Sequence, residues 1–253
     1  MTFRQTAIKA AKEAGKIQLK YFGNIKDIKY KDKTNAVTNA DLEAEDKILK
    51  IIKGSFPDHN ILSEESGAIG KGSEYKWLID PLDGTHNYMH NLPLFGISIA
   101  LEYKKEIVLG VIYLPYFDSL YVAERGKGAF LNDKRIKVSG VEEFGRSMIF
   151  LDGGLHRELK NRFKLVSNLA KDVHKMRVMG VAVIDFVYVA EGRIEASILF
   201  PTNPWDIAAG ILIVKEAGGK VTDFEGKMAS PYSNKIIISN GKVHEKVLRI
   251  LSK

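Results

Sequence analysis

The chain has 253 residues, of which 45% are hydrophobic and 27% are charged, and it contains no cysteine. These values are typical of a globular protein with a sizeable core, and they exclude disulfides and thiolate metal sites. The 38 Lys and Arg residues outnumber the 31 Asp and Glu residues, which gives a formal net charge of +7. Because the basic residues are spread along the chain, we expect no nucleic-acid partner.

The start of the chain does not have the pattern of a signal peptide. Charged side chains interrupt residues 1–22, so that no continuous apolar segment forms there. No apolar run in the sequence reaches the roughly 18 residues that a membrane span needs. We therefore expect a cytoplasmic protein that makes no contact with a membrane.

The spacing of apolar residues in the first part of the chain predicts two helices followed by a series of strands. The expected helices are residues 2–21 and 41–55, and the expected strands are residues 60–63, 74–79, 95–102, 107–113 and 119–123. The last three strands are expected to form an antiparallel meander. A hairpin with its tip at Asn132-Asp133 is expected to follow them.

The pattern changes near residue 143, after which helices and strands are mixed. The expected strands are residues 147–151, 173–177 and 194–200, and the expected helices are residues 157–170, 182–190, 207–217 and 243–251. Blocks of helices and mainly antiparallel strands are typical of stacked helix and sheet layers. We therefore expect one α+β domain of two tightly packed halves, residues 1–143 and 144–253.

Four carboxylates carry the chemistry that the sequence indicates: Glu64, Asp80, Asp83 and Asp206. Each lies at the end of a predicted strand or at the start of a predicted helix. Taken singly, each could be a helix cap, a turn or a solvated loop residue. Asp80 and Asp83, however, stand three residues apart, and carboxylates crowded in this way repel each other unless a cation or a proton lies between them.

The residues after Asp83 add a place for an anion. Gly84-Thr85 can open a helix, and the first turn of a helix offers free backbone N–H groups to a phosphate. Oxygen-only ligation favours Mg²⁺ or Mn²⁺ over Zn²⁺, and two divalent ions would cancel the charge of four carboxylates. The pattern therefore indicates metal-assisted hydrolysis of a phosphate ester.

Several segments together resemble the inositol monophosphatase family, the Mg²⁺-dependent, lithium-sensitive sugar-phosphate phosphatases. The segments that carry the resemblance are 36–41, 63–67, 77–85, 125–129 with Asn132, 204–209 and 216–219. They occur in the family's order over nearly the full length. The resemblance implies a layered αβαβα sandwich, a homodimer, and a small phosphorylated polyol or sugar as substrate.

The resemblance also implies roles for individual residues. Glu64, Asp80 and the Leu82 carbonyl would bind one Mg²⁺. Asp80, Asp83 and Asp206 would bind a second, with Mn²⁺ as a substitute, and Glu64 would reach a third, weakly held ion through water. Asp41 and Thr85 would form a dyad that orients a metal-activated water for in-line attack on phosphorus. The catalytic residues would therefore be Asp41, Glu64 and Thr85.

The resemblance defines the substrate side less completely. The residues that would contact the substrate are Asp83, Gly84, Thr85, His86, Arg177, Gly180, Val181, Ala182 and Asp206. Leu199 stands where animal members of the family carry a glutamate that bonds a substrate hydroxyl. Because leucine accepts no hydrogen bond, selectivity for inositol should weaken, which leaves room for fructose 1,6-bisphosphate.

Alternatives to an inositol phosphatase remain open at this stage. One is a phosphatase of the same superfamily that acts on 3′-phosphoadenosine 5′-phosphate or on histidinol phosphate. Another is a catalytically idle relative that acts as a regulatory binding protein, although none of the family's metal ligands is lost here. A nucleic-acid binder, the last alternative, would show steep salt dependence and release no phosphate.

Overall fold

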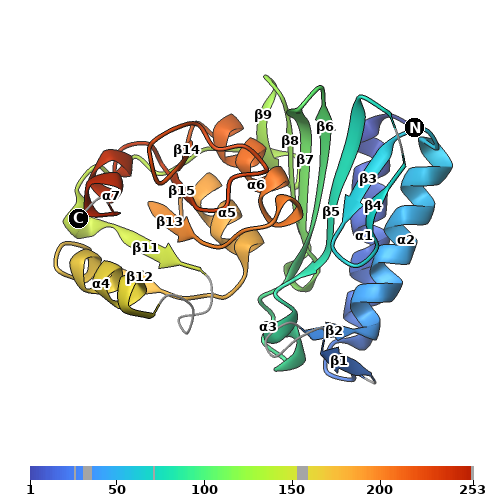
Figure 1. Cartoon of the computed structure of the whole chain (residues 1–253), viewed down its shortest axis with the longest axis horizontal. Coiled ribbons are helices and arrows are strands. Elements are labelled where there is room, and N and C mark those ends of the chain that lie inside the picture. The colour runs from blue at the N-terminus through green and yellow to red at the C-terminus, as the bar shows by residue number, and fades with distance from the viewer. Residues whose placement is uncertain (26, 31–35, 71, 153–158, 252–253) are drawn as a thin grey trace.

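Five layers of helices and sheets make up the protein, in the order αβαβα (Figure 1). The computed structural model describes residues 1–25, 27–30, 36–70, 72–152 and 159–251. This arrangement confirms the predicted α+β sandwich. The division of the chain near residue 143 stays a prediction, and the expected helix start at residue 157 lies outside the described residues.

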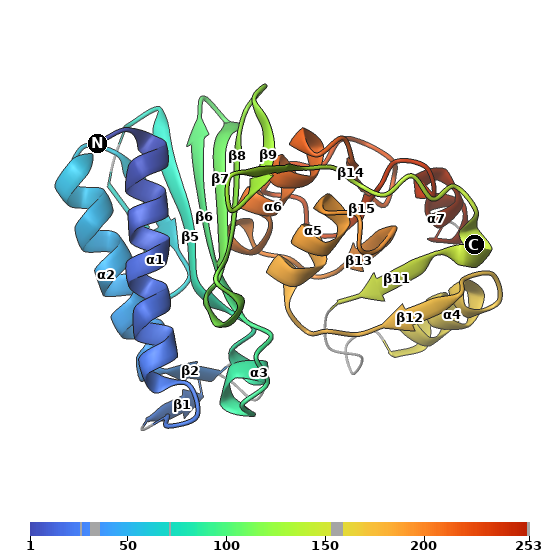
Figure 2. The ribbon, with the colours of Figure 1, turned by 180° about the vertical axis from the view of Figure 1, so that it is seen from behind.

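Helices α1 (Phe3–Tyr21) and α2 (Asn39–Ser55) form the first layer and cover one face of the larger sheet (Figure 2). The face of α1 that packs inward is made of small residues, and four alanines on it are fully buried, namely Ala7, Ala10, Ala11 and Ala14. Both helices begin at a threonine, Thr2 or Thr38, that forms a capping box. Their apolar faces pack against the sheet around Trp77.

The larger sheet contains eight strands in the order β10-β9-β8-β7-β6-β5-β3-β4. Its strands are β3 (Asn60–Ser63), β4 (Gly67–Ile69), β5 (Tyr75–Asp83), β6 (Gly96–Tyr103), β7 (Glu106–Leu114), β8 (Ser119–Glu124), β9 (Gly128–Leu131) and β10 (Lys134–Ile136). Strands β6 to β8 form the expected antiparallel meander, which β5 extends on one side and the β9–β10 hairpin on the other, while β3 runs parallel to β5.

The predicted end of β5 at residue 79 is wrong, because the strand continues to Asp83. Its pairing with β6 shifts register between Asp80 and Asp83. Pro81 lies within this irregularity and has no N–H to donate, so that the ladder is interrupted there. The shift gives the two aspartates different surroundings within one strand.

Strands β1 (Ile28–Tyr30) and β2 (Ala36–Thr38), which pair with each other, were not anticipated. The expected helix after Gly84-Thr85 is confirmed, because α3 (Thr85–Met89) begins there. Short 3₁₀ turns cover Pro115–Phe117 and Phe144–Arg146.

Helices α5 (Ala182–Ala190) and α6 (Pro204–Glu216) form the middle layer (Figure 1). They are apolar around almost their whole circumference because a sheet covers them on either side. A Cβ on Gly210 would lie only 2.1 Å from the Phe186 ring, so this glycine allows α6 to lie directly against α5.

The second sheet has the strand order β12-β11-β13-β15-β14. Its strands are β11 (Met148–Leu151), β12 (Lys175–Arg177), β13 (Ala196–Leu199), β14 (Lys220–Asp223) and β15 (Ile236–Ser239). Strand β11 runs parallel to both β12 and β13. Helices α4 (Leu159–Ala170) and α7 (His244–Leu251) cover the outer face. In the part of the chain described, no helix is both long and apolar enough to cross a membrane.

Candidate active site

The end of β5 places Asp80 at the centre of the candidate site. Its side chain is only 2% exposed, and its Oδ1 accepts a hydrogen bond from the Leu82 amide at 2.9 Å. The Pro81 carbonyl accepts a buried hydrogen bond of 2.6 Å from Gln18 of α1. Helix α1 therefore fixes the irregular segment of β5 that carries both aspartates.

The start of α6 brings Asp206 to the same place. Asp80 is paired across the sheet with Ser98, whose hydroxyl donates to the Trp205 carbonyl at 2.9 Å. Asp206 accepts hydrogen bonds from the Asn203 amide at 2.8 Å and the Asn203 side chain at 3.2 Å, as part of a capping box. The cap and the contact with β6 together hold Asp206 beside the strand of Asp80.

Asp83 joins the end of β5 to the predicted substrate loop. Its Oδ2 accepts a hydrogen bond of 2.6 Å from the Val183 amide in the first turn of α5. Gly84 has φ +88°, and a Cβ there would lie 2.7 Å from the Leu94 carbonyl and 3.0 Å from Val181. A residue without a side chain is therefore required at this position, and Val181 of the predicted substrate loop lies next to it.

Asp41 and Thr85 form the predicted pair. The Thr85 hydroxyl lies 3.1 Å from Asp41 Oδ1 and 3.1 Å from the Leu82 carbonyl, so its single proton can be donated to either oxygen. Thr38 donates its amide, at 2.8 Å, and its hydroxyl, at 2.5 Å, to the other oxygen of Asp41. The Asp41 carboxylate is thus fixed from α2 and faces the end of β5.

Glu64 lies directly after β3, and its amide donates to the Ile79 carbonyl at 3.2 Å. The turn that carries it is held by Glu45, a residue that the sequence reasoning missed. Glu45 is 3% exposed, and its carboxylate accepts hydrogen bonds from the Ser63 hydroxyl, the Glu65 amide at 3.2 Å, and the Ser66 amide and hydroxyl at 3.2 and 2.9 Å. The sequence held a signal for this role, because Glu45 lies one helical turn after Asp41 and therefore on the same face of α2.

The carboxylates act on one another electrostatically. Burial raises the pKa of Asp80 well above its usual value, and the charges of Glu64, Asp83 and Asp206 raise it further. Burial and the Asp206 charge likewise raise the pKa of Asp83. The pKa of Asp206 rises to about 7, chiefly through burial and then through Glu64. Burial also raises the pKa of Asp41 to about 6. The four predicted ligands therefore share one neighbourhood.

This donor set fits a hard divalent cation, since it consists of carboxylate oxygens and backbone carbonyls. Asp83 and Asp206 remain partly exposed, which leaves them open to an ion despite their dense surroundings. Within the described residues, however, no three Asp, Glu, His or Cys side chains stand grouped to hold a metal ion. The carboxylates are thus near one another without forming a ready-made ligand cage.

The model of the inositol monophosphatase family matches residues 1–253. The chain belongs to this family. It is similar to the fructose-1,6-bisphosphatase/inositol-1-monophosphatase of Thermotoga maritima, with 38% identity over 247 residues, 97% of this chain and 94% of that protein. It is also 38% identical over 247 residues to the Nus factor SuhB of Pasteurella multocida, covering 96% of this chain and 92% of that protein.

Solved structures agree with the family assignment. The extragenic suppressor protein suhB from Bartonella henselae superposes with a TM-score of 0.95 at 37% identity, over 99% of this chain and 98% of that one. The two chains therefore share the complete layered architecture.

Two of the segments that carry the resemblance to the inositol monophosphatase family, residues 125–129 and 216–219, lie outside the candidate site. The Glu216 carboxylate accepts hydrogen bonds of 2.7 Å each from the Gly126 and Gly128 amides. This contact ties the turn between β8 and β9 to the last turn of α6, at the end of the helix away from Asp206. The segments 125–129 and 216–219 are thus linked by a structural contact.

Two of the residues predicted to contact substrate are exposed on the surface of their elements. His86 is exposed on α3. Arg177 is exposed on β12, and its guanidinium donates to the neighbouring Met176 carbonyl at 2.8 Å. Asn87, to which no role was assigned, holds the predicted substrate loop, because its side chain donates to the Met179 carbonyl at 2.9 Å and to the Leu94 carbonyl at 3.1 Å.

Two further aspartates of this family member extend the acidic neighbourhood. Asp185 lies on α5, where its Oδ2 accepts a hydrogen bond of 2.5 Å from the Ser197 hydroxyl, and its Oδ1 is buried without a partner among the described residues. Its pKa is raised well above the usual value by burial and then by the charge of Asp152. Asp152 directly follows a strand, as Glu64 does, and this position was the sequence signal that could have identified it as a site residue.

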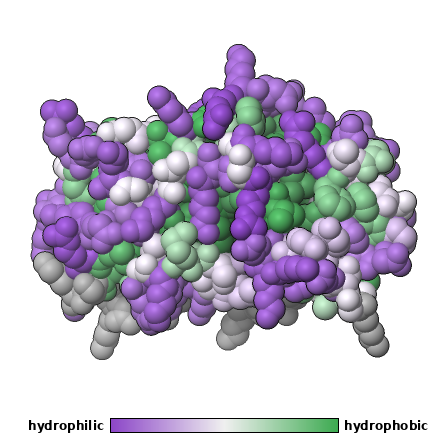
Figure 3. Space-filling view, turned by 90° about the horizontal axis from the view of Figure 1, so that it is seen from above, coloured by the Kyte–Doolittle hydropathy of each residue, from purple (hydrophilic) through white to green (hydrophobic). Residues whose placement is uncertain are grey.

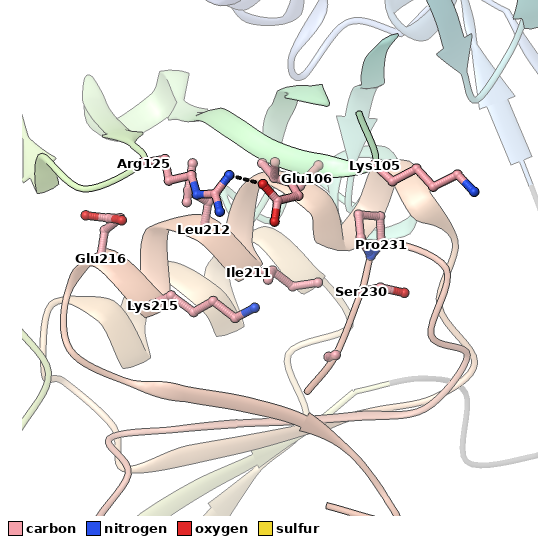
Figure 4. A pocket seen from close by; sticks show the side chains of 11 residues that line it. Lys105, Glu106, Arg125, Ile211, Leu212, Lys215, Glu216, Ser230 and Pro231 are labelled. Carbon is pink, nitrogen blue, oxygen red and sulfur yellow. Dashed lines mark hydrogen bonds and ion pairs between the residues drawn. The ribbon is translucent and has the colours of Figure 1, made fainter. Parts of the chain in front are cut away.

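A separate cavity of about 340 Å³ lies at the far end of α6 (Figure 4). Glu106 and Arg125 form an ion pair on one side of it, and the Lys215 side chain lies along α6 on the other. Burial and the charge of Arg125 lower the pKa of Lys215. On this end of the molecule, hydrophobic surface is visible between hydrophilic side chains (Figure 3). None of the site carboxylates lines this cavity.

Proposed function

We propose that this chain is a Mg²⁺-dependent phosphomonoesterase that hydrolyses inositol monophosphate and also accepts fructose 1,6-bisphosphate. The observation that carries the proposal is the convergence of Asp80, Asp83 and Asp206 beside the Asp41–Thr85 hydrogen bond. Burial, and then the charges of neighbouring carboxylates, raise the pKa of all three aspartates, so that their ionised forms are unfavourable without a cation. Divalent cations bind well to such a group of carboxylates, because they keep the oxygens ionised and cancel their charge.

The residues that would hold the cations are Glu64, Asp80, the Leu82 carbonyl, Asp83 and Asp206. When bound, the cations would activate water and stabilise the charge that develops on the leaving oxygen. The Thr85 hydroxyl can donate to Asp41 and accept a hydrogen bond from the attacking water through its remaining lone pair. Because Asp41 is fixed by Thr38, the dyad would hold one lone pair of Thr85 toward the end of β5.

The names of relatives support the substrate class. The Thermotoga maritima relative is named for both fructose 1,6-bisphosphate and inositol 1-phosphate, and a Mesorhizobium japonicum relative with 37% identity is named an inositol-1-monophosphatase. A homodimer, which the family resemblance implies, and a cytoplasmic location, which was expected from the sequence, belong to the same proposal.

Phosphate release from a substrate panel tests the proposal. The panel contains inositol 1-phosphate, fructose 1,6-bisphosphate, 3′-phosphoadenosine 5′-phosphate and histidinol phosphate, each with EDTA, with Mg²⁺, and with Mg²⁺ plus Li⁺. We expect Mg²⁺-dependent, Li⁺-inhibited release from the first two substrates. Release only from 3′-phosphoadenosine 5′-phosphate or only from histidinol phosphate would replace the substrate assignment. No release from any of the four substrates would refute the proposed phosphatase activity.

A regulatory binding role is the second candidate, because several similar proteins carry the name Nus factor SuhB. The retained carboxylates argue that such a role would exist beside catalysis rather than in its place. An Asp80→Asn variant tests this point. Loss of phosphate release with unchanged binding of a protein partner would separate the two functions, whereas loss of both would tie binding to the site.

A further inference from the structure

Asp152 lies beside Leu199 at the edge of the second sheet that faces the site. Strands β11 and β13 are parallel, with Phe150 paired to Ser197 and Leu151 paired to Ile198. The Asp152 amide donates to the Ile198 carbonyl at 2.9 Å, which continues the ladder by one residue. The next pair in this register is therefore Asp152 and Leu199.

Strand alternation decides which way Asp152 faces. Leu151 and Ile198 are buried with the outer helices, whereas Phe150 and Leu199 belong to the core around α5 and α6. Because successive residues of a strand point to opposite faces, Asp152 lies on the face of Phe150, toward the middle layer. Electrostatics agree, since the Asp152 charge contributes to the raised pKa of Asp185, Asp83 and Asp206.

Of the two residues in this pair, only Asp152 has exposed surface that a substrate could contact. Leu199 is 1% exposed and apolar, while Asp152 is partly exposed. A carboxylate accepts hydrogen bonds and repels phosphate. It therefore suits the hydroxyl groups of the alcohol that leaves, and it opposes a second phosphate in the same position.

We propose that Asp152 determines specificity by accepting hydrogen bonds from hydroxyl groups of the alcohol part of the substrate. The inference rests on the proposed phosphatase function and concerns which alcohol it favours. A polyol monophosphate is preferred over a sugar bisphosphate, because Asp152 attracts hydroxyl donors and repels a second phosphate.

The test compares Asp152→Asn with the wild-type protein on three substrates at saturating Mg²⁺. These are inositol 1-phosphate, fructose 1,6-bisphosphate and p-nitrophenyl phosphate, whose leaving group has no hydroxyl besides the reacting oxygen. We expect kcat/KM for inositol 1-phosphate to fall about tenfold or more, mainly through KM, as loss of a charged hydrogen bond implies. We expect p-nitrophenyl phosphate to change less than about twofold, and the ratio of bisphosphate to monophosphate activity to rise.

Asp172→Asn is the matched control, since Asp172 is half exposed and pairs with Lys246 outside the site. Asp152→Ala serves as a second variant and should show the same substrate-selective loss. Equal losses on all three substrates, no change on any, or a shifted Mg²⁺ dependence with p-nitrophenyl phosphate would each overturn the proposal. If the wild-type protein releases no phosphate, the proposed function fails instead, and the two failures are distinguishable.

Discussion

Replacing Asp206 with asparagine should stabilise the metal-free protein at pH 8. Burial raises the pKa of Asp206 from 3.8 to about 7, so ionisation of this group destabilises the folded state relative to the unfolded chain. The contribution of the raised pKa to the free energy of unfolding is therefore complete below about pH 4, where Asp206 is protonated in the folded state and mostly protonated in the unfolded chain. It is lost as the pH rises through about 7. Asparagine cannot ionise, so the variant escapes this loss.

The magnitude follows from the pKa. A rise from 3.8 to about 7 corresponds to about 4 kcal/mol of unfolding free energy at high pH. Asp206 is partly exposed, so that solvent screens part of this effect, and we expect a net gain of about 2–3 kcal/mol. In a chain of this length, such a gain raises the melting temperature by roughly 5–10 °C. At pH 5 the gain should be about a third as large.

Thermal unfolding followed by circular dichroism, in EDTA at pH 5 and pH 8, measures the effect. The asparagine oxygen can still accept from the Asn203 amide, so the start of α6 should be preserved. Asp133→Asn is a suitable control because the Asp133 side chain is 89% exposed. Added Mg²⁺ should stabilise the wild-type protein much more than the variant. A variant that is no more stable than the wild-type protein at pH 8 in EDTA would refute the electrostatic reasoning.

Other substitutions test the remaining parts of the site. Asp80→Asn should abolish Mg²⁺-dependent phosphate release with an unchanged circular dichroism spectrum, and retained turnover would contradict its role. Thr85→Ala should lower kcat about 100-fold at an unchanged Mg²⁺ concentration for half-maximal activity, while Thr85→Ser should keep most of the rate. An unaltered kcat in the alanine variant would refute the catalytic role of the Asp41–Thr85 pair. Glu45→Gln should loosen the turn that carries Glu64 and raise the Mg²⁺ concentration for half-maximal activity several-fold, which a Mg²⁺ titration of activity checks. Gly84→Ala should destabilise the fold by about 2 kcal/mol or more in urea unfolding, because φ is +88° and a Cβ would lie 2.7 Å from a backbone carbonyl.

Local pattern was sufficient for most elements, and it predicted a chemistry for the site. Helical spacing predicted α1 and α2, and alternating apolar runs predicted the meander from β6 to β8. The positions of Asp80, Asp83 and Asp206 at element ends indicated a cation site because such ends can converge. The family resemblance rested on the same short segments, and the match over residues 1–253 confirmed it.

Tertiary structure alone decided how distant segments meet. The register shift in β5 depends on pairing with β6, and the function of Glu45 depends on the turn after β3 that folds against α2. The placement of Asp152 beside Leu199 follows from the alignment of two strands, β11 and β13, that are separated in the chain by two helices and a further strand. Sequence periodicity states which side of an element is apolar. It does not state which other element covers that side or in what register, because those choices depend on the packing of the whole chain.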